Sequence, residues 1–313
     1  MKYKAAVIEE YRRPFHVKIV EAPDEPRQGW VRVRVRAVGM CGRDLVVWKG
    51  GFPNLKPPII PGHEVFGELD GKPVAVYPAV MDCRGGECRT LILGEDLPGG
   101  YAEYVDVPRE NIIPLPLEDR DYEKYAAATC GVATLIHAAR IAGVKPGDRA
   151  LVTGATGGVG LHGLQYLVSR SVEVYAYTRR SEYNELLRSL GAHPVNDLGF
   201  YREAGRMDYV FENVGAALIN ESLRTLRSRG TLVLIGNTEG TPINLTRPAM
   251  IVQRELVIKG SMAFLPDEYA EAIKLIREGR VKPVYQAYRL DDINDAVRSV
   301  LEKKRVGRIV LIP

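Results

Sequence analysis

The sequence predicts a two-domain α/β protein in which a doubly wound parallel sheet follows a mainly β domain. Valine alternates with arginine through Trp30–Arg36, which is the two-residue period of a half-buried strand. Other short apolar runs, separated by Pro and Gly, fill the first third of the chain and are typical of an all-β region. From Ala150 onward a strand, a glycine-rich turn and a helix follow one another, and strand and helix patterns then keep alternating.

Length and composition agree with two domains. The chain has 313 residues, and 46% of them are hydrophobic, which is enough for two cores. A net charge of +4 with 26% charged residues predicts neither a nucleic-acid nor a membrane partner. No apolar run suits a signal peptide or the ~20 residues of a membrane span, so we expect a cytoplasmic protein. Sparse glutamine is compatible with a thermophilic source.

The expected elements follow in chain order. Early strands are expected at 4–8, 17–20 and 30–36, and Ala-rich helix formers begin at Tyr122 and end at Gly143. Apolar runs then predict the strands of the parallel sheet, at 150–152, 172–177, 207–211, 231–235 and 255–261. After residue 265 the pattern predicts a helix, a strand near Tyr285, a second helix and a final strand over 307–312.

The turn that runs from Thr153 to Gly160 (TGATGGVG) predicts a dinucleotide-binding unit. Its missing side chains let the backbone approach a pyrophosphate, which would sit on the free N–H groups of the following helix. We expect Gly157, Gly158 and Val159 to provide that contact.

The end of the next strand indicates which dinucleotide binds. NAD(H) would require an Asp or Glu there to hold both ribose hydroxyls, but the sequence has Thr178, Arg179 and Arg180. Two guanidinium groups suit bidentate contact with a phosphate, so the sequence favours NADP(H). Solvated loop charges would explain the arginines but not the missing acid.

Two further strand ends are expected to line the cofactor site. Asn213 and Val214 follow one strand, and Ile235 and Gly236 end the next. In a doubly wound sheet, ligands lie beyond the carboxyl ends of the strands. The alternative is that both are ordinary turns.

Cysteine and histidine in three separate segments predict a metal site. Cys41, His63 and Cys130 are good zinc ligands, and three protein ligands with one open position make a catalytic zinc. Glu64 stands directly beside the histidine. The alternative is that the cysteines are small buried hydrophobes and the histidine is a satisfied loop residue.

Together these motifs resemble those of the zinc-dependent medium-chain alcohol dehydrogenases, over essentially the whole chain. The shared features are Cys41 with Asp44, Gly62-His63-Glu64 with Gly67, the segment 99–104, Cys130-Gly131, the glycine-rich turn and Gly307-Arg308. The resemblance implies a GroES-like catalytic domain over 1–125, a Rossmann domain over 126–263 and a C-terminal return to the catalytic domain over 264–313. It also implies one catalytic zinc per chain and a homo-oligomer, either dimer or tetramer.

The resemblance also implies an activity. With the cofactor favoured above, it is reversible hydride transfer between NADP(H) and a small-molecule alcohol, aldehyde or ketone, with zinc polarising the substrate oxygen. Neither the substrate nor the physiological direction is specified by the sequence.

Residue roles follow from the same resemblance. Cys41, His63 and Cys130 would hold the zinc, and Glu64 would take or release its fourth position. Asp44 would orient the histidine through its other ring nitrogen.

Two more residues would contact the cofactor. Thr134 would touch the nicotinamide, one helical turn after the cysteine ligand. Arg308 would reach the pyrophosphate, with a plain surface charge as the alternative.

Arg43 departs from the family pattern, which usually has Ser or Thr here as the first step of a proton relay. A guanidinium cannot relay a proton at neutral pH. The proton could leave through water instead. Arg43 itself could bind an anionic substrate or a cofactor phosphate, point to solvent, or pair with an acid.

A second departure is the lobe around Cys83 and Cys88, where most zinc-containing relatives have four cysteines. Two thiolates cannot close a tetrahedral structural site. Asp82 and Glu87 could in principle complete one; otherwise the two cysteines are either free or joined in a small disulfide.

Two other functions remain open. The loop form with Ala155 and the reduced lobe also occur in zinc-free quinone or enoyl reductases of the same superfamily. An NADPH-binding protein without enzymatic activity, its relay disabled by Arg43, is the third reading. The complete set of zinc ligands favours the dehydrogenase.

Overall fold

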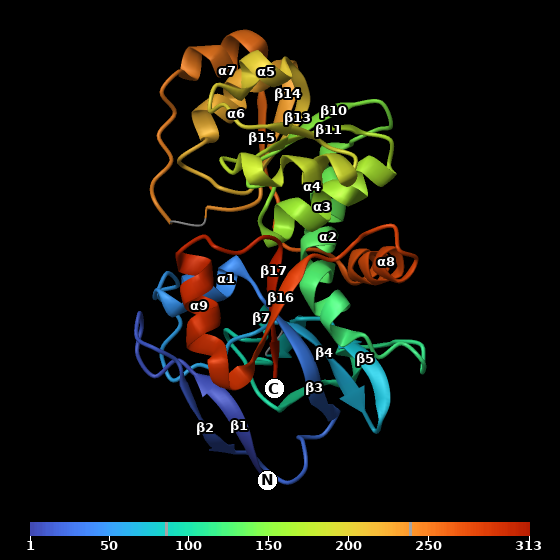
Figure 1. Cartoon of the computed structure of the whole chain (residues 1–313). Coiled ribbons are helices and arrows are strands. Elements are labelled where there is room, and N and C mark those ends of the chain that lie inside the picture. The colour runs from blue at the N-terminus through green and yellow to red at the C-terminus, as the bar shows by residue number, and fades with distance from the viewer. Residues whose placement is uncertain (85–86, 238–239) are drawn as a thin grey trace. The chain divides into compact units, whose positions relative to one another are not determined.

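The computed structural model describes residues 1–84, 87–237 and 240–313 (Figure 1). They form two compact units, one made of Met1–Ala127 with Tyr285–Pro313 and the other of Ala128–Val284. The helix α2 (Tyr122–Ala142) begins in the first unit and continues into the second. No helix in the described ranges is both long and apolar enough to cross a membrane.

The first unit is built on a seven-stranded sheet with β3 (Trp30–Met40) at its centre, as expected of a mainly β domain. Antiparallel partners of β3 are β4 (Glu64–Leu69), β8 (Tyr104–Pro108) and β17 (Arg308–Ile312). The sheet is completed by β5 (Lys72–Val76), β9 (Ile112–Pro114) and β16 (Tyr285–Arg289). Two strand pairs stand apart from it, β1 (Lys2–Val7) with β2 (His16–Glu21) and β6 (Ala79–Arg84) with β7 (Glu87–Ile92). The helices of this unit, besides the start of α2, are α1 (Gly42–Trp48), α9 (Ile293–Leu301) and the 3₁₀ turns Arg109–Asn111 and Leu290–Asp292.

The alternation in β3 has the predicted consequence. Val31, Val33 and Val35 are buried in the core of the first unit. The arginines between them face outward, and Arg32 is paired with Asp106 of β8 at 2.7 Å. One side of the strand therefore builds the core while the other is held by charge pairs.

The second unit contains a six-stranded sheet whose strands are all parallel. Their spatial order is β12 (His193–Val195), β11 (Glu173–Tyr177), β10 (Arg149–Val152), β13 (Met207–Glu212), β14 (Leu226–Leu234) and β15 (Val257–Gly260). The helices are α3 (Gly158–Ser169), α4 (Asn184–Ser189), α5 (Phe200–Ala204), α6 (Ile219–Thr225), α7 (Pro248–Arg254) and α8 (Pro266–Arg277), with a 3₁₀ turn at Ser181–Tyr183. This order confirms the doubly wound sheet. Its strand order reverses beside β10, and ligands bind at such switch points.

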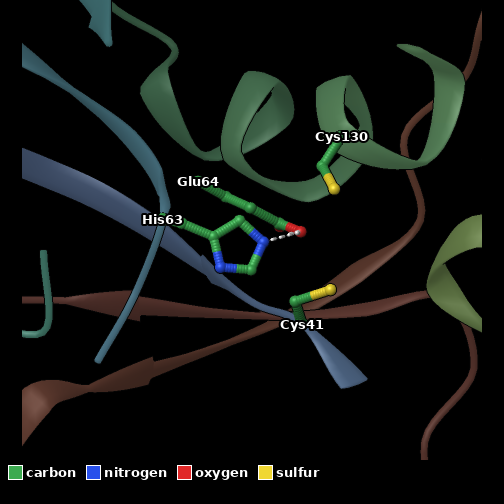
Figure 2. Close-up of side chains that lie close together, drawn as sticks. All are labelled: Cys41, His63, Glu64 and Cys130. Carbon is green, nitrogen blue, oxygen red and sulfur yellow. Dashed lines mark ion pairs between the residues drawn. The ribbon is translucent and has the colours of Figure 1, made fainter. Parts of the chain in front are cut away.

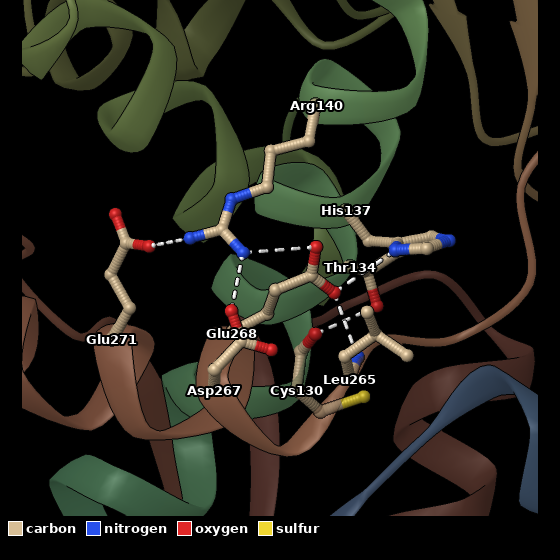
Figure 3. A network of polar contacts seen from close by, with 8 residues as sticks. All are labelled: Cys130, Thr134, His137, Arg140, Leu265, Asp267, Glu268 and Glu271. Atoms are coloured by element: carbon tan, nitrogen blue, oxygen red, sulfur yellow. Dashed lines mark hydrogen bonds and ion pairs between the residues drawn. The ribbon is translucent and has the colours of Figure 1, made fainter.

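The second unit extends to Val284, whereas the sequence analysis expected the cofactor domain to end at residue 263. The reason is that α8 packs against α2 through charged side chains (Figure 3). Glu268, only 1% exposed, lies 2.9 Å from Nδ1 of His137 and 3.3 Å from Nη1 of Arg140. Asp267 also pairs with Arg140, at 2.7 Å. The helical period of α8 predicts a helix but not its docking partner.

After Val284 the chain rejoins the first unit. β16 pairs parallel with β17, and β17 pairs antiparallel with the end of β3, where Ile309 faces Met40. The last strand thus lies against the strand that leads into Cys41.

Candidate metal centre and cofactor-binding turn

Four potential metal ligands gather at the end of β3. Pairing between β3 and β4 sets Gly39 opposite Glu64, which brings the start of α1 beside the turn before β4. Cys41 caps α1, Glu64 begins β4 with His63 directly before it, and Cys130 comes from α2. The ligand atoms of these four residues all lie within 4.8 Å of one another (Figure 2). The structure therefore brings together every metal ligand that the sequence predicts.

The donor set fits a zinc ion. A tetrahedral zinc site with bonds of about 2.0–2.3 Å holds its ligand atoms about 3.3–3.8 Å apart. Two thiols, an imidazole and a carboxylate within 4.8 Å are close to that arrangement. Both thiols are free of disulfide bonds. Both Glu64 oxygens are buried and accept no hydrogen bond among the described residues, although Oε1 forms an ion pair with Arg308.

His63 is oriented by a buried carboxylate. Its Nδ1 lies 3.1 Å from Oδ1 of Asp44, and the other carboxylate oxygen accepts hydrogen bonds from the Cys41 amide (2.7 Å) and the Tyr101 hydroxyl (2.8 Å). Burial lowers the pKa of His63, but Asp44 and Cys41 raise it more, so it lies well above its usual range. Asp44 thus holds the Nδ1 proton, and a metal at Nε2 would replace the second proton that the raised pKa keeps on the ring.

Tyr101 and Gly62 fix this carboxylate and the turn before His63. Burial and the Asp44 carboxylate raise the pKa of Tyr101 well above its usual range, so its hydroxyl remains a donor. Gly62 has a φ of +98°, and a Cβ there would lie 2.4 Å from the Tyr101 ring. Only glycine suits this position.

Glu64 lies in a tight polar pocket with Arg308. Its Oε1 is 3.0 Å from Nη2 of Arg308, and both side chains are almost fully buried. Burial raises the pKa of Glu64 to about 7, while Arg308 works against that rise. A Cβ at Gly39 would lie 2.0 Å from Oε2, so glycine makes room for the carboxylate. Arg308 is therefore not a surface charge, and its contact with a cofactor stays a prediction.

Arg43 pairs with an acid. Both Glu95 carboxylate oxygens accept hydrogen bonds from the Arg43 guanidinium, with Nη2 to Oε2 at 2.8 Å, and Cζ of Arg43 lies 4.8 Å from the centre of the Phe52 ring. The hydrogen bond to Glu95 raises the pKa of Arg43, which keeps its proton. Among the roles that the sequence left open for Arg43, the structure has the ion pair with an acid.

Cys83 and Cys88 form a disulfide. They face each other across the β6–β7 hairpin, with Cα atoms 4.1 Å apart. Of the two states left open by the sequence, the structure has the bonded one.

The glycine-rich turn leads from β10 into α3 as predicted. Gly157 caps the helix, and Gly158 and Val159 form its first turn. A Cβ at Gly160 would lie 2.4 Å from the Gly154 carbonyl oxygen, so the turn closes only with glycine there. Backbone N–H groups at this helix start are available for a phosphate.

The residues after β11 lie beside this turn. The Ala155 amide donates to the Tyr177 carbonyl at 3.1 Å, which joins the turn to the end of β11. Thr178 is buried, Arg179 is exposed, and the Arg180 guanidinium lies 4.3 Å from the centre of the Tyr183 ring. The structure therefore brings the end of β11 and Thr178 beside the glycine-rich turn, and the contact of either arginine with a phosphate stays a prediction.

The ends of β13 and β14 meet each other. The amides of Ile235 and Gly236 donate to the Glu212 carbonyl at 3.0 and 3.2 Å. Asn213 donates through its side chain to the Thr153 carbonyl at 2.9 Å, so it also contacts the glycine-rich turn. Val214 approaches the same turn, with its Cγ2 3.3 Å from a Cβ built on Gly154.

Thr134 bonds within its own helix. Its hydroxyl donates to the Cys130 carbonyl at 2.7 Å, and the side chain is buried (Figure 3). The contact of Thr134 with a nicotinamide stays a prediction.

Sequence reasoning missed three polar residues of these sites. Tyr101 belongs to the segment that carried the resemblance, but its hydroxyl was assigned no role. Glu95 and Glu212 stand in no motif, and only the folded chain reveals their partners. An isolated acid between apolar strand residues and Asn-Val-Gly was the available signal for Glu212.

Comparison with known proteins gives matches over both units. The family model described as alcohol dehydrogenase GroES-like domain matches residues 27–117. The one described as zinc-binding dehydrogenase matches residues 158–278.

Individual relatives align along nearly the whole chain. An alcohol dehydrogenase of Geobacillus stearothermophilus is 30% identical, over 98% of this chain and 99% of the relative. An acryloyl-coenzyme A reductase of Metallosphaera sedula is 28% identical, over 98% and 99%. The solved structure of a cobalt- and zinc-bound thermostable alcohol dehydrogenase from Pyrobaculum aerophilum is similar with a TM-score of 0.89 and 26% identity, covering 100% of both chains.

Proposed function

The chain belongs to the alcohol dehydrogenases of the medium-chain dehydrogenase/reductase superfamily and is an oxidoreductase, and on this premise we propose that it is a zinc enzyme dependent on NADP(H). It transfers a hydride reversibly between the nicotinamide and a small-molecule alcohol, aldehyde or ketone. The observation that carries this proposal is the cluster of Cys41, His63, Glu64 and Cys130.

In this proposal Cys41, His63 and Cys130 hold the zinc, and Glu64 stands at the fourth position. The zinc ion, when bound, supplies Lewis-acid polarisation of a substrate oxygen. Asp44 keeps the His63 tautomer that presents Nε2. Arg308 balances the charge of Glu64 while that carboxylate is away from the metal.

The proposed cofactor site is built from residues of the second unit. The helix start at Gly157–Val159 receives the pyrophosphate, and Arg179 with Arg180 receives the 2′-phosphate. The nicotinamide supplies or accepts the hydride. This half of the proposal is supported by a helix start without a side-chain cap and by the two arginines that follow the neighbouring strand β11.

Proton transfer needs a route other than Arg43. Its guanidinium is engaged by Glu95 and keeps its proton, so it serves neither as an acid nor as a base. We propose that Arg43 connects α1 to the segment around Glu95. Water would then accept or donate the proton of the reaction.

A second candidate function is reduction of a carbon–carbon double bond. It is favoured by the relative named acryloyl-coenzyme A reductase, which aligns along nearly the whole chain. The ligand cluster favours the dehydrogenase, because double-bond reduction by hydride transfer does not require a polarising metal.

A screen of cofactors and substrates tests the proposal. We expect oxidation of NADPH with aldehydes or ketones, and slower oxidation with activated alkenes. Faster turnover of alkenes than of every carbonyl compound would support the second candidate. Absence of turnover with all of them would contradict both.

Neutral replacement of the two arginines tests the cofactor preference. The double substitution Arg179→Ser with Arg180→Ser should lower the affinity for NADPH by about 10–100-fold, because hydrogen bonds to a charged group are lost. The affinity for NADH should be nearly unchanged. Arg188→Ser, in the exposed face of α4, is the matched control. An unchanged preference would place the 2′-phosphate elsewhere.

We also propose a homo-oligomer that pairs through β15. This strand ends the six-stranded sheet, and its Val257 and Ile258 remain 44% and 43% exposed. An edge strand with exposed apolar side chains is a surface for pairing. Light scattering should give the molar mass of at least a dimer. Ile258→Lys should shift the protein toward the monomer. A monomeric wild type would contradict this proposal.

A further inference from the structure

Glu212 occupies a site in the second unit that no motif explains. It is the last residue of β13, directly before Asn213, and it is 0% exposed. A buried carboxylate is costly unless hydrogen bonds satisfy it. Its partners therefore indicate what it is for.

Four donors converge on this one carboxylate. Oε1 accepts from the Thr153 hydroxyl at 2.8 Å and from the amides of Val214 and Gly215 at 2.8 and 3.0 Å. Oε2 accepts from the hydroxyl of Ser222 on α6. Thr153 opens the glycine-rich turn, while Val214 and Gly215 belong to the loop after β13. One carboxylate thus joins the turn that the proposed function assigns to the cofactor and the loop that the sequence predicts to line the same site.

The hydrogen bonds continue from Glu212 to Asn213. The Asn213 amide donates to Oγ1 of Thr153 at 2.9 Å, and that hydroxyl donates onward to Glu212. The Asn213 side chain donates through Nδ2 to the Thr153 carbonyl, also at 2.9 Å. Asn213 is therefore held at both its backbone and its side chain by Thr153, whose own orientation is set by Glu212.

The other end of the Asn213 amide has no partner. Its Oδ1 is buried and accepts no hydrogen bond from any residue that the structure describes. The Nδ2 contacts fix which way this oxygen points. A buried acceptor left open in this way is suited to a donor from a ligand.

We infer that Glu212 is a positioning residue for the dinucleotide, and that through Thr153 it aims Oδ1 of Asn213 at a hydroxyl or amide donor of the bound cofactor. The inference rests on the proposed function for the identity of the ligand. Ribose hydroxyls and the nicotinamide carboxamide are the donors that such a cofactor offers.

Two hydroxyl deletions at the same carboxylate separate positioning from plain stability. Thr153→Val removes the hydroxyl that leads to Asn213, and Ser222→Ala removes the one that leads to α6. Both should lower the melting temperature. Only Thr153→Val should lower the affinity for NADPH, by about tenfold in a fluorescence titration. That change corresponds to the loss of one or two hydrogen bonds. Ser222→Ala should stay within about twofold.

A double-mutant cycle tests the route through Asn213. Asn213→Ala alone should lower the affinity for NADPH by about tenfold. If Thr153 acts through Asn213, the double variant should bind NADPH no more weakly than the weaker-binding single variant. Zinc content should be unchanged in all of them.

Three results would overturn the inference. They are NADPH affinity within twofold of wild type for Asn213→Ala, equal weakening by Thr153→Val and Ser222→Ala, or multiplied losses in the double variant. A wild type that binds neither NADPH nor NADH would instead contradict the proposed function, and the inference with it.

Discussion

Cys41 and Cys130 are reduced and lie in a buried cluster, whereas Cys83 and Cys88 are oxidised and exposed on a hairpin. The first pair comes from segments far apart in the chain, and the members of the second pair are five positions apart. The difference lies in what surrounds them. An imidazole and a carboxylate join the first pair, while the second pair is bonded across two strands. Neighbours brought by the fold, more than spacing, decide which thiols suit a metal.

The two pairs also differ in how firmly they are held. His63 is oriented by Asp44, which the Cys41 amide and the Tyr101 hydroxyl hold in turn. The hairpin cysteines are held by their disulfide and by cross-strand pairing. We therefore expect substitutions around the first pair to change metal binding, and substitutions of the second pair to change stability alone.

The largest effect is expected for Cys41→Ala. Because this removes a thiolate ligand, bound zinc and turnover should both be lost, while NADPH affinity should be nearly unchanged. Metal analysis and a fluorescence titration measure the two properties. Equal loss of zinc and NADPH binding would contradict the separate roles of the two sites.

Asp44→Asn should come next. The amide no longer stabilises the Nδ1–H tautomer as a carboxylate does, and loss of such a partner lowers metal affinity by about 10–100-fold. Competition with a chromophoric chelator measures zinc affinity directly. An affinity equal to that of wild type would show that Asp44 does not orient His63.

Tyr101→Phe should have a smaller effect of the same kind. It removes one of two donors to Asp44 Oδ2, so we expect zinc affinity to fall by about 3–10-fold, as for one hydrogen bond to a charged group. Tyr125→Phe is the matched control, because Tyr125 is also buried and its hydroxyl donates to Asp119, outside the cluster. Equal changes in the two variants would assign Tyr101 a purely structural role.

The smallest effect on the metal site is expected for Cys83→Ser with Cys88→Ser. Closing so short a loop stabilises a protein by about 2 kcal/mol, so the free energy of unfolding should fall by no more than that. Zinc content and turnover should equal those of wild type. Loss of zinc in this variant would break the comparison between the two cysteine pairs.

Much of the fold could be predicted because its signals are local. Alternation through Trp30–Arg36 marks β3, and an apolar run before a glycine-rich turn marks β10 and α3. The docking of α8 could not be predicted in this way. It depends on Glu268 meeting His137 across more than a hundred residues of chain.

The candidate site divides along the same line. The metal ligands stand in recognisable motifs, so the sequence identified all four. The partners of Arg43 and Asp44 are set by tertiary packing, which left Glu95 and Tyr101 unassigned. The disulfide was left open because cross-strand register decides it, and the sequence does not specify that register.

The central claim is that Cys41, His63, Glu64 and Cys130 hold a zinc ion that the reaction requires. The most direct test is zinc per chain measured together with NADPH-dependent turnover, before and after chelation. We predict about one zinc per chain, loss of carbonyl reduction when it is removed, and recovery when it is restored. Less than about half a zinc per chain, with retained reduction of double bonds, would contradict the account.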